Sequence, residues 1–199
     1  ITSEFPHNGF TGNVGGIGTF VKNLSKELLK ESNRISVFMY NQSENKIFND
    51  GMLTIHHVKI KKLKGFTWWF TRKHFNDYVN QVVEREKIDI IEAPEWSGFT
   101  AFMKFNCPLV VRLHGSDTYF CYLENRKVKK KNKFFERKAL IGADKIVGVS
   151  DFVSRETEKL FHLKDRIEVI HNGINVEKFI PDNTSIKKKS ILYFGTIIR

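Results

Sequence analysis

Short apolar runs alternate along the chain with longer segments in which apolar residues recur every three to four positions. The short runs are rich in Ile and Val, which is typical of strands buried in a parallel sheet. They predict strands at 34–40, 53–60, 88–94, 108–115, 145–150, 167–173 and 190–195. The longer segments predict helices at 16–30, 67–86, 133–141 and 151–161. Strands and helices that alternate in this way favour an open, doubly wound α/β sheet.

The two longest predicted helices each carry an apolar stripe. In the first, the stripe consists of Ile17, Phe20, Val21, Leu24 and Leu28. In the second, it consists of Trp69, Phe70, Phe75, Tyr78, Val79, Val82 and Val83. Gly142 is a plausible helix stop, and Ser150 or Asp151 can cap the last predicted helix. Such stripes are typical of one face of an amphipathic helix.

The loops that follow the strands are the places to look for a binding site. Ligands of open α/β sheets bind beyond the carboxyl ends of the strands, where the chain turns into the next helix. This rule selects residues 13–18, 94–98, 114–117, 150–151 and 171–173.

The first of these loops is rich in glycine. Glycines at 12, 15, 16 and 18 come directly before or at the start of the first helix. Glycine lets the backbone approach a ligand closely, and the N–H groups at a helix start favour a phosphate. The spacing matches neither the dinucleotide-binding motif nor the P-loop. A flexible turn that serves helix packing fits these glycines equally well.

Two further loops carry side chains suited to a polar ligand. His114 ends a buried strand, and Asp117 follows three residues later, so both can reach the same crevice as the glycine loop. Glu95 and Trp96 combine a carboxylate with an aromatic plane, which is a common way to hold a sugar. A histidine with a backbone partner, and a helix-capping Glu beside a buried Trp, are the structural alternatives. None of the histidines shows metal-ligand spacing.

Composition narrows the class of protein. With 199 residues, 41% of them hydrophobic, the chain can bury a core. The net charge of +11 favours an anionic partner: nucleic acid, a membrane face or a phosphorylated substrate. Cys107 and Cys121 form no C-x-x-C pair, which fits a reducing cytoplasm better than a secreted disulfide scaffold. No apolar run approaches the roughly 20 residues that a membrane span needs.

Five ordered segments together resemble a known family. They are GGIGTFVKNLSKELLK, IDIIEAPEWSG, PLVVRLHGSD, ERKALIGADKIVGVSDFV and IEVIHNGINVEKFIP. The chain thereby resembles the N-terminal domain of a family 4 glycosyltransferase of the GT-B fold. The resemblance implies a Rossmann-like, mostly parallel acceptor-side domain at 1–180, a linker at 181–190 and the first strand of a C-terminal donor-binding domain at 191–199. A fragment of this extent is expected to be inactive alone.

The resemblance also implies roles for the candidate residues. Gly15 and Gly16 would bring backbone N–H groups to the diphosphate of a nucleotide-sugar donor. His114 would be the catalytic residue that hydrogen-bonds the transferred sugar near the reacting carbon. The expected reaction retains the anomeric configuration through an oxocarbenium-like state. The nucleotide sugar is a substrate, and neither a cofactor nor a metal is expected. The residues expected on the acceptor side are Glu95, Trp96 and Asp117.

Two segments mix basic and aromatic residues, at 59–75 (KIKKLKGFTWWFTRKHF) and at 125–138 (NRKVKKKNKFFERK). Both suit docking on an anionic membrane that presents a lipid-linked acceptor. Solvated helix faces over an ordinary aromatic core are the alternative. We expect a cytoplasmic protein, peripheral at the inner face of the plasma membrane, that takes part in bacterial surface polysaccharide synthesis.

Other classes of protein remain open at this point. The charge and the interleaved aromatic residues suit a nucleic-acid-binding α/β module, although no RRM, KH or helix-turn-helix pattern is present. A sugar-nucleotide epimerase of GT-B architecture is the nearest alternative enzyme. A dinucleotide-dependent oxidoreductase is disfavoured by the glycine spacing. On balance we expect a sugar donor and a glycan or lipid-linked acceptor, and no nucleic acid partner.

Overall fold

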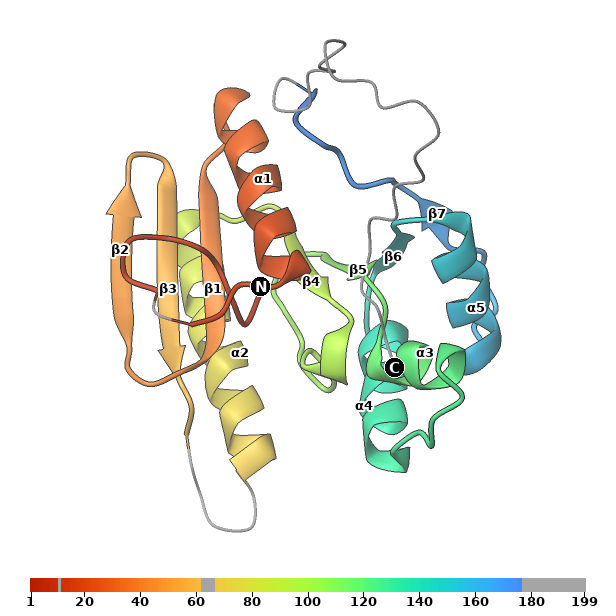
Figure 1. The fold of residues 1–199 in the computed structure, drawn as a ribbon. Coiled ribbons are helices and arrows are strands. Elements are labelled where there is room, and N and C mark those ends of the chain that lie inside the picture. Colours follow the sequence, from red (N-terminus) through yellow and green to blue (C-terminus); the bar gives the residue numbers. More distant parts are fainter. Residues whose placement is uncertain (11, 62–66, 177–199) are drawn as a thin grey trace.

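The computed structural model describes residues 1–10, 12–61 and 67–176 (Figure 1). Its strands form two sheets. The first has the order β1-β3-β2, with β1 (Ile35–Gln42), β2 (Lys46–Asp50) and β3 (Leu53–Lys59). The second has the order β4-β5-β6-β7, with β4 (Ile91–Pro94), β5 (Leu109–Leu113), β6 (Lys145–Gly148) and β7 (Glu168–Val169). All neighbouring pairs are parallel except β2 and β3. The mostly parallel α/β fold is therefore confirmed.

The first residues of the chain connect the two sheets. Thr2 forms a parallel bridge with Met39 of β1, and its N–H donates to the Phe38 carbonyl at 2.9 Å. On the other side, the Ile1 nitrogen donates to the Glu92 carbonyl of β4 at 2.7 Å. Residues 1–3 therefore lie between β1 and β4, and the segment that follows them starts from the middle of the strand array.

The helices agree closely with the sequence pattern. They are α1 (Gly16–Lys30), α2 (Thr67–Glu86), α3 (Asp117–Leu123), α4 (Lys130–Ile141) and α5 (Asp151–Phe161), with a short 3₁₀ helix η1 (Trp96–Gly98). The predicted helices at 16–30, 67–86 and 151–161 have the observed bounds. Ser150 caps α5, since its hydroxyl accepts the Val153 N–H at 3.2 Å. Of the helices in the described residues, α3 and η1 were not predicted.

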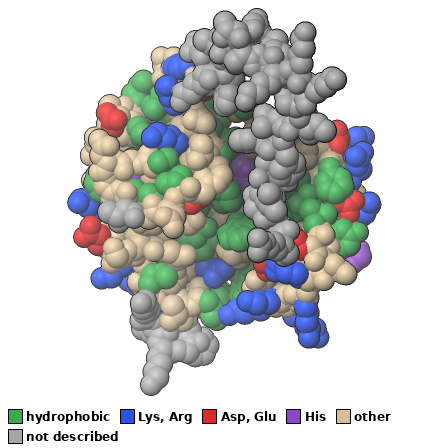
Figure 2. Space-filling model, viewed as in Figure 1, with side chains coloured by type: hydrophobic (Ala, Val, Ile, Leu, Met, Phe, Trp, Pro, Cys, Tyr) green, Lys and Arg blue, Asp and Glu red, His purple; other side chains and the backbone are tan. Residues whose placement is uncertain are grey.

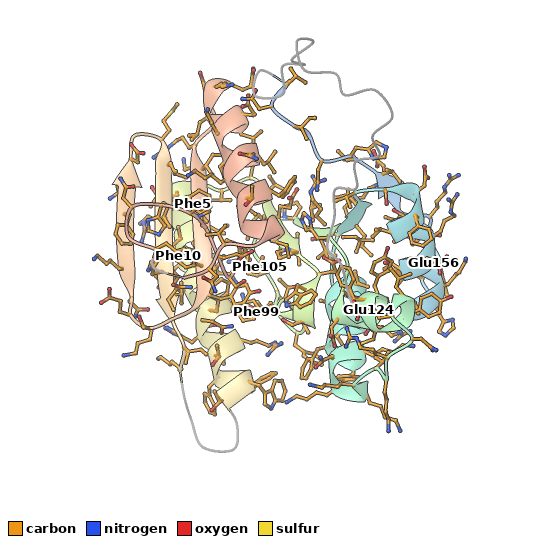
Figure 3. All side chains as sticks on the ribbon, in the orientation of Figure 1. Phe5, Phe10, Phe99, Phe105, Glu124 and Glu156 are labelled. Atoms are coloured by element: carbon orange, nitrogen blue, oxygen red, sulfur yellow. The ribbon has the colours of Figure 1, made fainter. Side chains whose placement is uncertain are left out.

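The buried side chains of β1 point alternately to the two faces of the first sheet. Val37 and Met39 pack on the side of α1 with Phe5 and Phe10, which are labelled in Figure 3. Phe38 and Tyr40 point the opposite way, towards α2. This is the period-2 alternation of a strand that is covered on both faces. Phe99, also labelled in Figure 3, stacks on Tyr40 with ring centroids 3.7 Å apart.

Some elements differ from the prediction. Strand β2 was not predicted, because most of its residues are exposed and it pairs antiparallel at the edge of the sheet. In place of the strands predicted at 88–94 and 167–173, the structure has the shorter strands β4, with four residues, and β7, with two. Trp69 and Phe70, which belong to the apolar stripe of the second predicted helix, are 42% and 40% exposed. The linker at 181–190 and the strand at 191–199 lie outside the described residues.

Gly98 brings η1 unusually close to α4. Its φ is +57°, and a Cβ placed there would lie 2.2 Å from the Phe135 carbonyl carbon. Backbone atoms of a packed helix cannot move aside as a flexible side chain can. Glycine at this position therefore fixes the distance between the loop after β4 and α4.

Replacing Gly98 by alanine should destabilise the protein much more than the same change at Gly51. Gly51 has almost the same φ, +59°, but nothing lies within 4 Å of an added Cβ. We expect Gly51→Ala to lower the free energy of unfolding by about 1 kcal/mol, from backbone strain alone. Gly98→Ala should lower it by about 3 kcal/mol or more, because α4 must also move. Chemical denaturation measures both, and equal losses would contradict the close approach.

Candidate active site

Three of the loops selected by the sequence lie in one region, at the carboxyl ends of the strands. Phe20 of α1 contacts the His114 ring edge-on, with centroids 4.9 Å apart. The Glu95 carboxylate accepts the Gly115 N–H at 2.5 Å. The first contact connects the glycine loop to the end of β5, and the second connects the end of β4 to the same place. The strand-end rule therefore selects residues that are neighbours in space.

The glycine turn is held by a carboxylate that sequence analysis did not select. Glu4 Oε2 accepts the Gly15 N–H at 2.8 Å, and Glu4 Oε1 accepts the Gly18 N–H at 3.0 Å. Gly15 is the N-cap of α1 and has no side chain to cap it. Gly16 is exposed, and nothing lies within 4 Å of a Cβ built on it. The start of α1 is therefore capped from one side and open at Gly16.

His114 lies in a half-buried position at the end of β5. Burial, together with the Arg112 guanidinium, lowers the pKa of His114 to about 4. Arg112 is buried and makes a two-pronged ion pair with Glu92, with N···O distances of 3.0 Å. Its guanidinium carbon also lies 5.0 Å from the centre of the Phe20 ring. At neutral pH His114 is therefore an uncharged imidazole that can donate one hydrogen bond and accept another.

Glu95 is placed differently from its expected role. It is 1% exposed, and its carboxylate points towards the backbone of the loop after β5. Its second oxygen, Oε2, is buried and has no hydrogen-bond partner among the described residues. Burial raises the pKa of Glu95 to about 7. This placement disfavours a direct contact between Glu95 and an acceptor.

Trp96 stands on the exposed side of the same loop. It is 39% exposed, and its ring centroid lies 6.3 Å from that of Phe120 in α3. Phe120 in turn lies against Gly115, where an added Cβ would come within 2.7 Å of the ring. Gly115 has a φ of +106°, so a side chain there is disfavoured by backbone strain as well. Trp96 and Phe120 therefore form an aromatic edge next to His114.

Asp117 begins α3 and is tied into the same region. Its carboxylate accepts a hydrogen bond from Asn132 of α4 at 2.7 Å. Glu136, which is fully buried in α4, accepts the N–H groups of Asp117 and Thr118 at 3.0 and 3.2 Å. Both glutamate oxygens are thereby used to fix the start of α3. Asp117 remains half-exposed, so its contact with an acceptor stays a prediction.

A large groove of the described structure is not formed by these loops. It has a volume of about 830 Å³ and runs beneath α1, between the facing edges of β1 and β4. Of the predicted site residues only His114 lines it. The described residues contain no group of three or more His, Cys, Asp or Glu that could hold a metal ion. Among these residues, no helix is long and apolar enough to cross a membrane.

The supporting residues were missed for different reasons. Arg112 had a visible signal, because a charge within the apolar run PLVVRLHG must be paired if it is buried. Glu136 had none, since it sits in a helix among lysines and resembles an exposed residue. Glu4 and Phe20 depend on contacts across 11 or more positions, which periodicity cannot show.

Comparison with known proteins identifies the family. The sequence model of Glycosyltransferase Family 4 matches residues 14–178. The chain belongs to glycosyltransferase family 4, and it is therefore a glycosyltransferase. A solved sucrose-phosphate synthase from Thermosynechococcus elongatus has the same fold, with a TM-score of 0.52 and 12% identity over 81% of this chain and 88% of that chain. This places the fold among the GT-B glycosyltransferases. No match is found among curated proteins.

Because burial raises the pKa of Glu95, the pH dependence of stability tests whether this carboxyl is buried. Between pH 4.5 and about 7 the unfolded chain loses this proton while the folded protein keeps it. The stability contributed by the protonated form is therefore lost as the pH rises through this window. Glu95→Gln cannot ionise and should gain about 3 kcal/mol relative to the wild type between pH 4.5 and 8. Denaturant unfolding of both proteins measures this, and a constant difference would contradict the raised pKa.

Proposed function

We propose that this chain is the acceptor-side domain of a retaining glycosyltransferase, which moves a hexose-type sugar from a nucleotide-sugar donor to a glycan or lipid-linked acceptor. One observation carries the proposal: Phe20, one helical turn after Gly16 on α1, contacts the ring of His114, whose pKa is lowered to about 4. A site for an anionic leaving group is thus next to a hydrogen-bonding group for the sugar. No cofactor is needed for this chemistry.

The glycine turn serves the leaving group. Gly16 is exposed at the first position of α1, where backbone N–H groups and the helix dipole favour an anion. A diphosphate bound there carries more charge as its bond to the anomeric carbon breaks. Backbone N–H groups that are already in place stabilise this charge without further reorganisation. Gly15 contributes by letting the turn approach the phosphate.

His114 serves the transferred sugar. Its low pKa keeps the imidazole neutral, so it donates a hydrogen bond to a sugar hydroxyl without adding positive charge beside an oxocarbenium-like centre. The bond from the anomeric carbon to the phosphate breaks, and the acceptor oxygen bonds to that carbon on the same face. The departing phosphate takes the hydroxyl proton of the acceptor. Configuration is retained, and no enzyme nucleophile is required.

The acceptor lies on the other side of His114 in this proposal. Trp96 and Phe120 present an exposed aromatic edge, of the kind on which the apolar face of a sugar ring can rest. Asp117 is half-exposed at the start of α3 and can accept a hydrogen bond from a hydroxyl. Glu95 acts here as a positioning residue, because its carboxylate holds the backbone next to His114.

The test is turnover of UDP-, GDP- and ADP-sugars by the full-length protein, with membranes as the source of acceptor. We expect one nucleotide to be released, and His114→Ala to reduce kcat/KM by about 100-fold or more, because the transition state loses a hydrogen bond. His162→Ala is the matched control, since His162 lies at the end of α5 and should leave the rate unchanged. Consumption of no donor by a folded protein would refute the proposal.

We also propose that the protein docks on an anionic membrane from the cytoplasmic side. The two basic and aromatic segments of the sequence meet in space where the first turn of α2 packs against the middle of α4, in the lower part of Figure 1. The ring centroids of Trp68 and Phe135 are 5.3 Å apart, and those of Phe102 and Phe134 are 6.0 Å apart. Residues 62–66 of the first segment lie outside the described part of the chain.

We call this surface the aromatic-basic face, and define it by Trp68, Trp69, Lys73, Phe102, Lys104, Phe134 and Lys138. Its four aromatic side chains are 37% to 50% exposed, a large apolar area for a surface. Lys73 and Lys104 line a shallow hollow with Trp69 and Phe102, and Lys138 lies 5.8 Å from the Phe134 ring. Figure 2 shows Lys and Arg side chains with hydrophobic ones along the lower edge of this view. Aromatic residues among cations suit anionic lipid headgroups.

Vesicle binding tests this surface. We expect the full-length protein to bind vesicles of phosphatidylcholine and phosphatidylglycerol at low salt, and to be released by salt because the lysine contacts are screened. Phe134→Ser should weaken binding by about tenfold, from the loss of one inserted aromatic ring. Phe152→Ser is the matched control, because Phe152 is equally exposed but lies on α5. Equal binding to pure phosphatidylcholine, or equal losses for both variants, would contradict docking.

A further inference from the structure

The start of α1 has to satisfy two opposing demands. A helix start needs acceptors for its first N–H groups, which an N-cap side chain normally supplies. A turn that admits a ligand needs glycine, which has no such side chain. The chain has glycine at both the N-cap and the first helical position, and no side chain of α1 itself caps the helix.

Glu4 supplies the missing cap from outside the helix. Its two carboxylate oxygens accept the N–H groups of Gly15, the N-cap, and Gly18, the third helical residue. These are the two N–H groups that a capping box would satisfy. Among the described residues, no acceptor is recorded for the N–H groups of Gly16 and Ile17, which lie between them. Glu4 therefore takes the two outer N–H groups and leaves the two inner ones.

Glu4 is itself held firmly in place. Thr2, which is fully buried between β1 and β4, uses its hydroxyl to bond both the carbonyl and the N–H of Glu4, at 2.8 and 3.2 Å. Gly18 admits the stem of Glu4, because an added Cβ at Gly18 would come within 2.8 Å of Glu4 Cγ. Glu4 is thus held in place by Thr2, which lies between β1 and β4, and the Glu4 carboxylate in turn holds the glycine turn.

We propose that Glu4 is a positioning residue, which shapes the glycine turn so that the N–H groups of Gly16 and Ile17 face the donor diphosphate. This inference rests on the proposed function. It assigns Glu4 a geometric role, because its carboxylate places two acceptor oxygens at the separation that the N–H groups of Gly15 and Gly18 require. Its negative charge is not the feature that matters for binding, since the ligand is also an anion.

The variants Glu4→Gln and Glu4→Asp separate geometry from charge. Glutamine keeps the length but has one acceptor in place of two, and aspartate keeps the charge but is one methylene shorter. In the full-length protein we expect both variants to raise the donor KM about tenfold, with kcat within about twofold, because donor binding rather than the chemical step is affected. Glu31→Gln, an exposed glutamate just after the other end of α1, is the control and should change neither constant.

Amide hydrogen exchange supplies a readout that is independent of activity. Exchange at the Gly15 and Gly18 amides of the full-length protein, which donate to Glu4, should accelerate in both Glu4 variants and remain unchanged in Glu31→Gln. Unchanged exchange or an unchanged KM in Glu4→Gln overturns the proposal. A lowered KM also overturns it, because Glu4 would then compete with the diphosphate. If the wild type consumes no sugar nucleotide, the proposed function has failed, and the exchange result alone decides whether Glu4 shapes the turn.

Discussion

Carboxylates that accept backbone N–H groups hold the candidate active site together. Glu4 fixes the start of α1, Glu95 fixes the backbone after β5, and Glu136 fixes the start of α3. In each case the glutamate belongs to a different element from the loop it holds. A hydrogen bond to an ionised or buried acceptor is stronger than one between neutral groups. Loops that carry glycine, and so have little stiffness of their own, thereby acquire defined shapes.

This arrangement explains why the site residues can be small or neutral. Nothing lies within 4 Å of a Cβ added at Gly16, whereas Gly15 and Gly115 give room to the Glu4 carboxylate and the Phe120 ring. The glutamates provide the rigidity that side chains in these loops would otherwise give. Arg112, which Glu92 holds in an ion pair, lies over the Phe20 ring, and its guanidinium adds to burial in lowering the pKa of His114, while Glu92 acts in the opposite direction. The residues that support these loops are thus different from the residues of the loops themselves.

The candidate active site and the aromatic-basic face lie at different places on the molecule. The strand-end loops form one region, and the aromatic-basic face lies along the N-terminal part of α2 and along α4 (Figure 1). Gly98 links them, because η1 follows Glu95 and packs directly against the backbone of α4. A protein that docks through α2 and α4 would therefore hold the candidate site at a fixed height above the docking surface.

The sequence alone determined the bounds of α1, α2 and α5, because these depend on local periodicity, and the strand-end rule selected loops of which three lie close together. It did not reveal β2, α3 or η1. Family membership followed from ordered motifs. Only the tertiary structure decided that Glu95 is buried, that Trp69 and Phe70 are exposed, and that Glu4 caps α1. Such placements depend on which distant segments meet, and the packing of the whole sheet determines that.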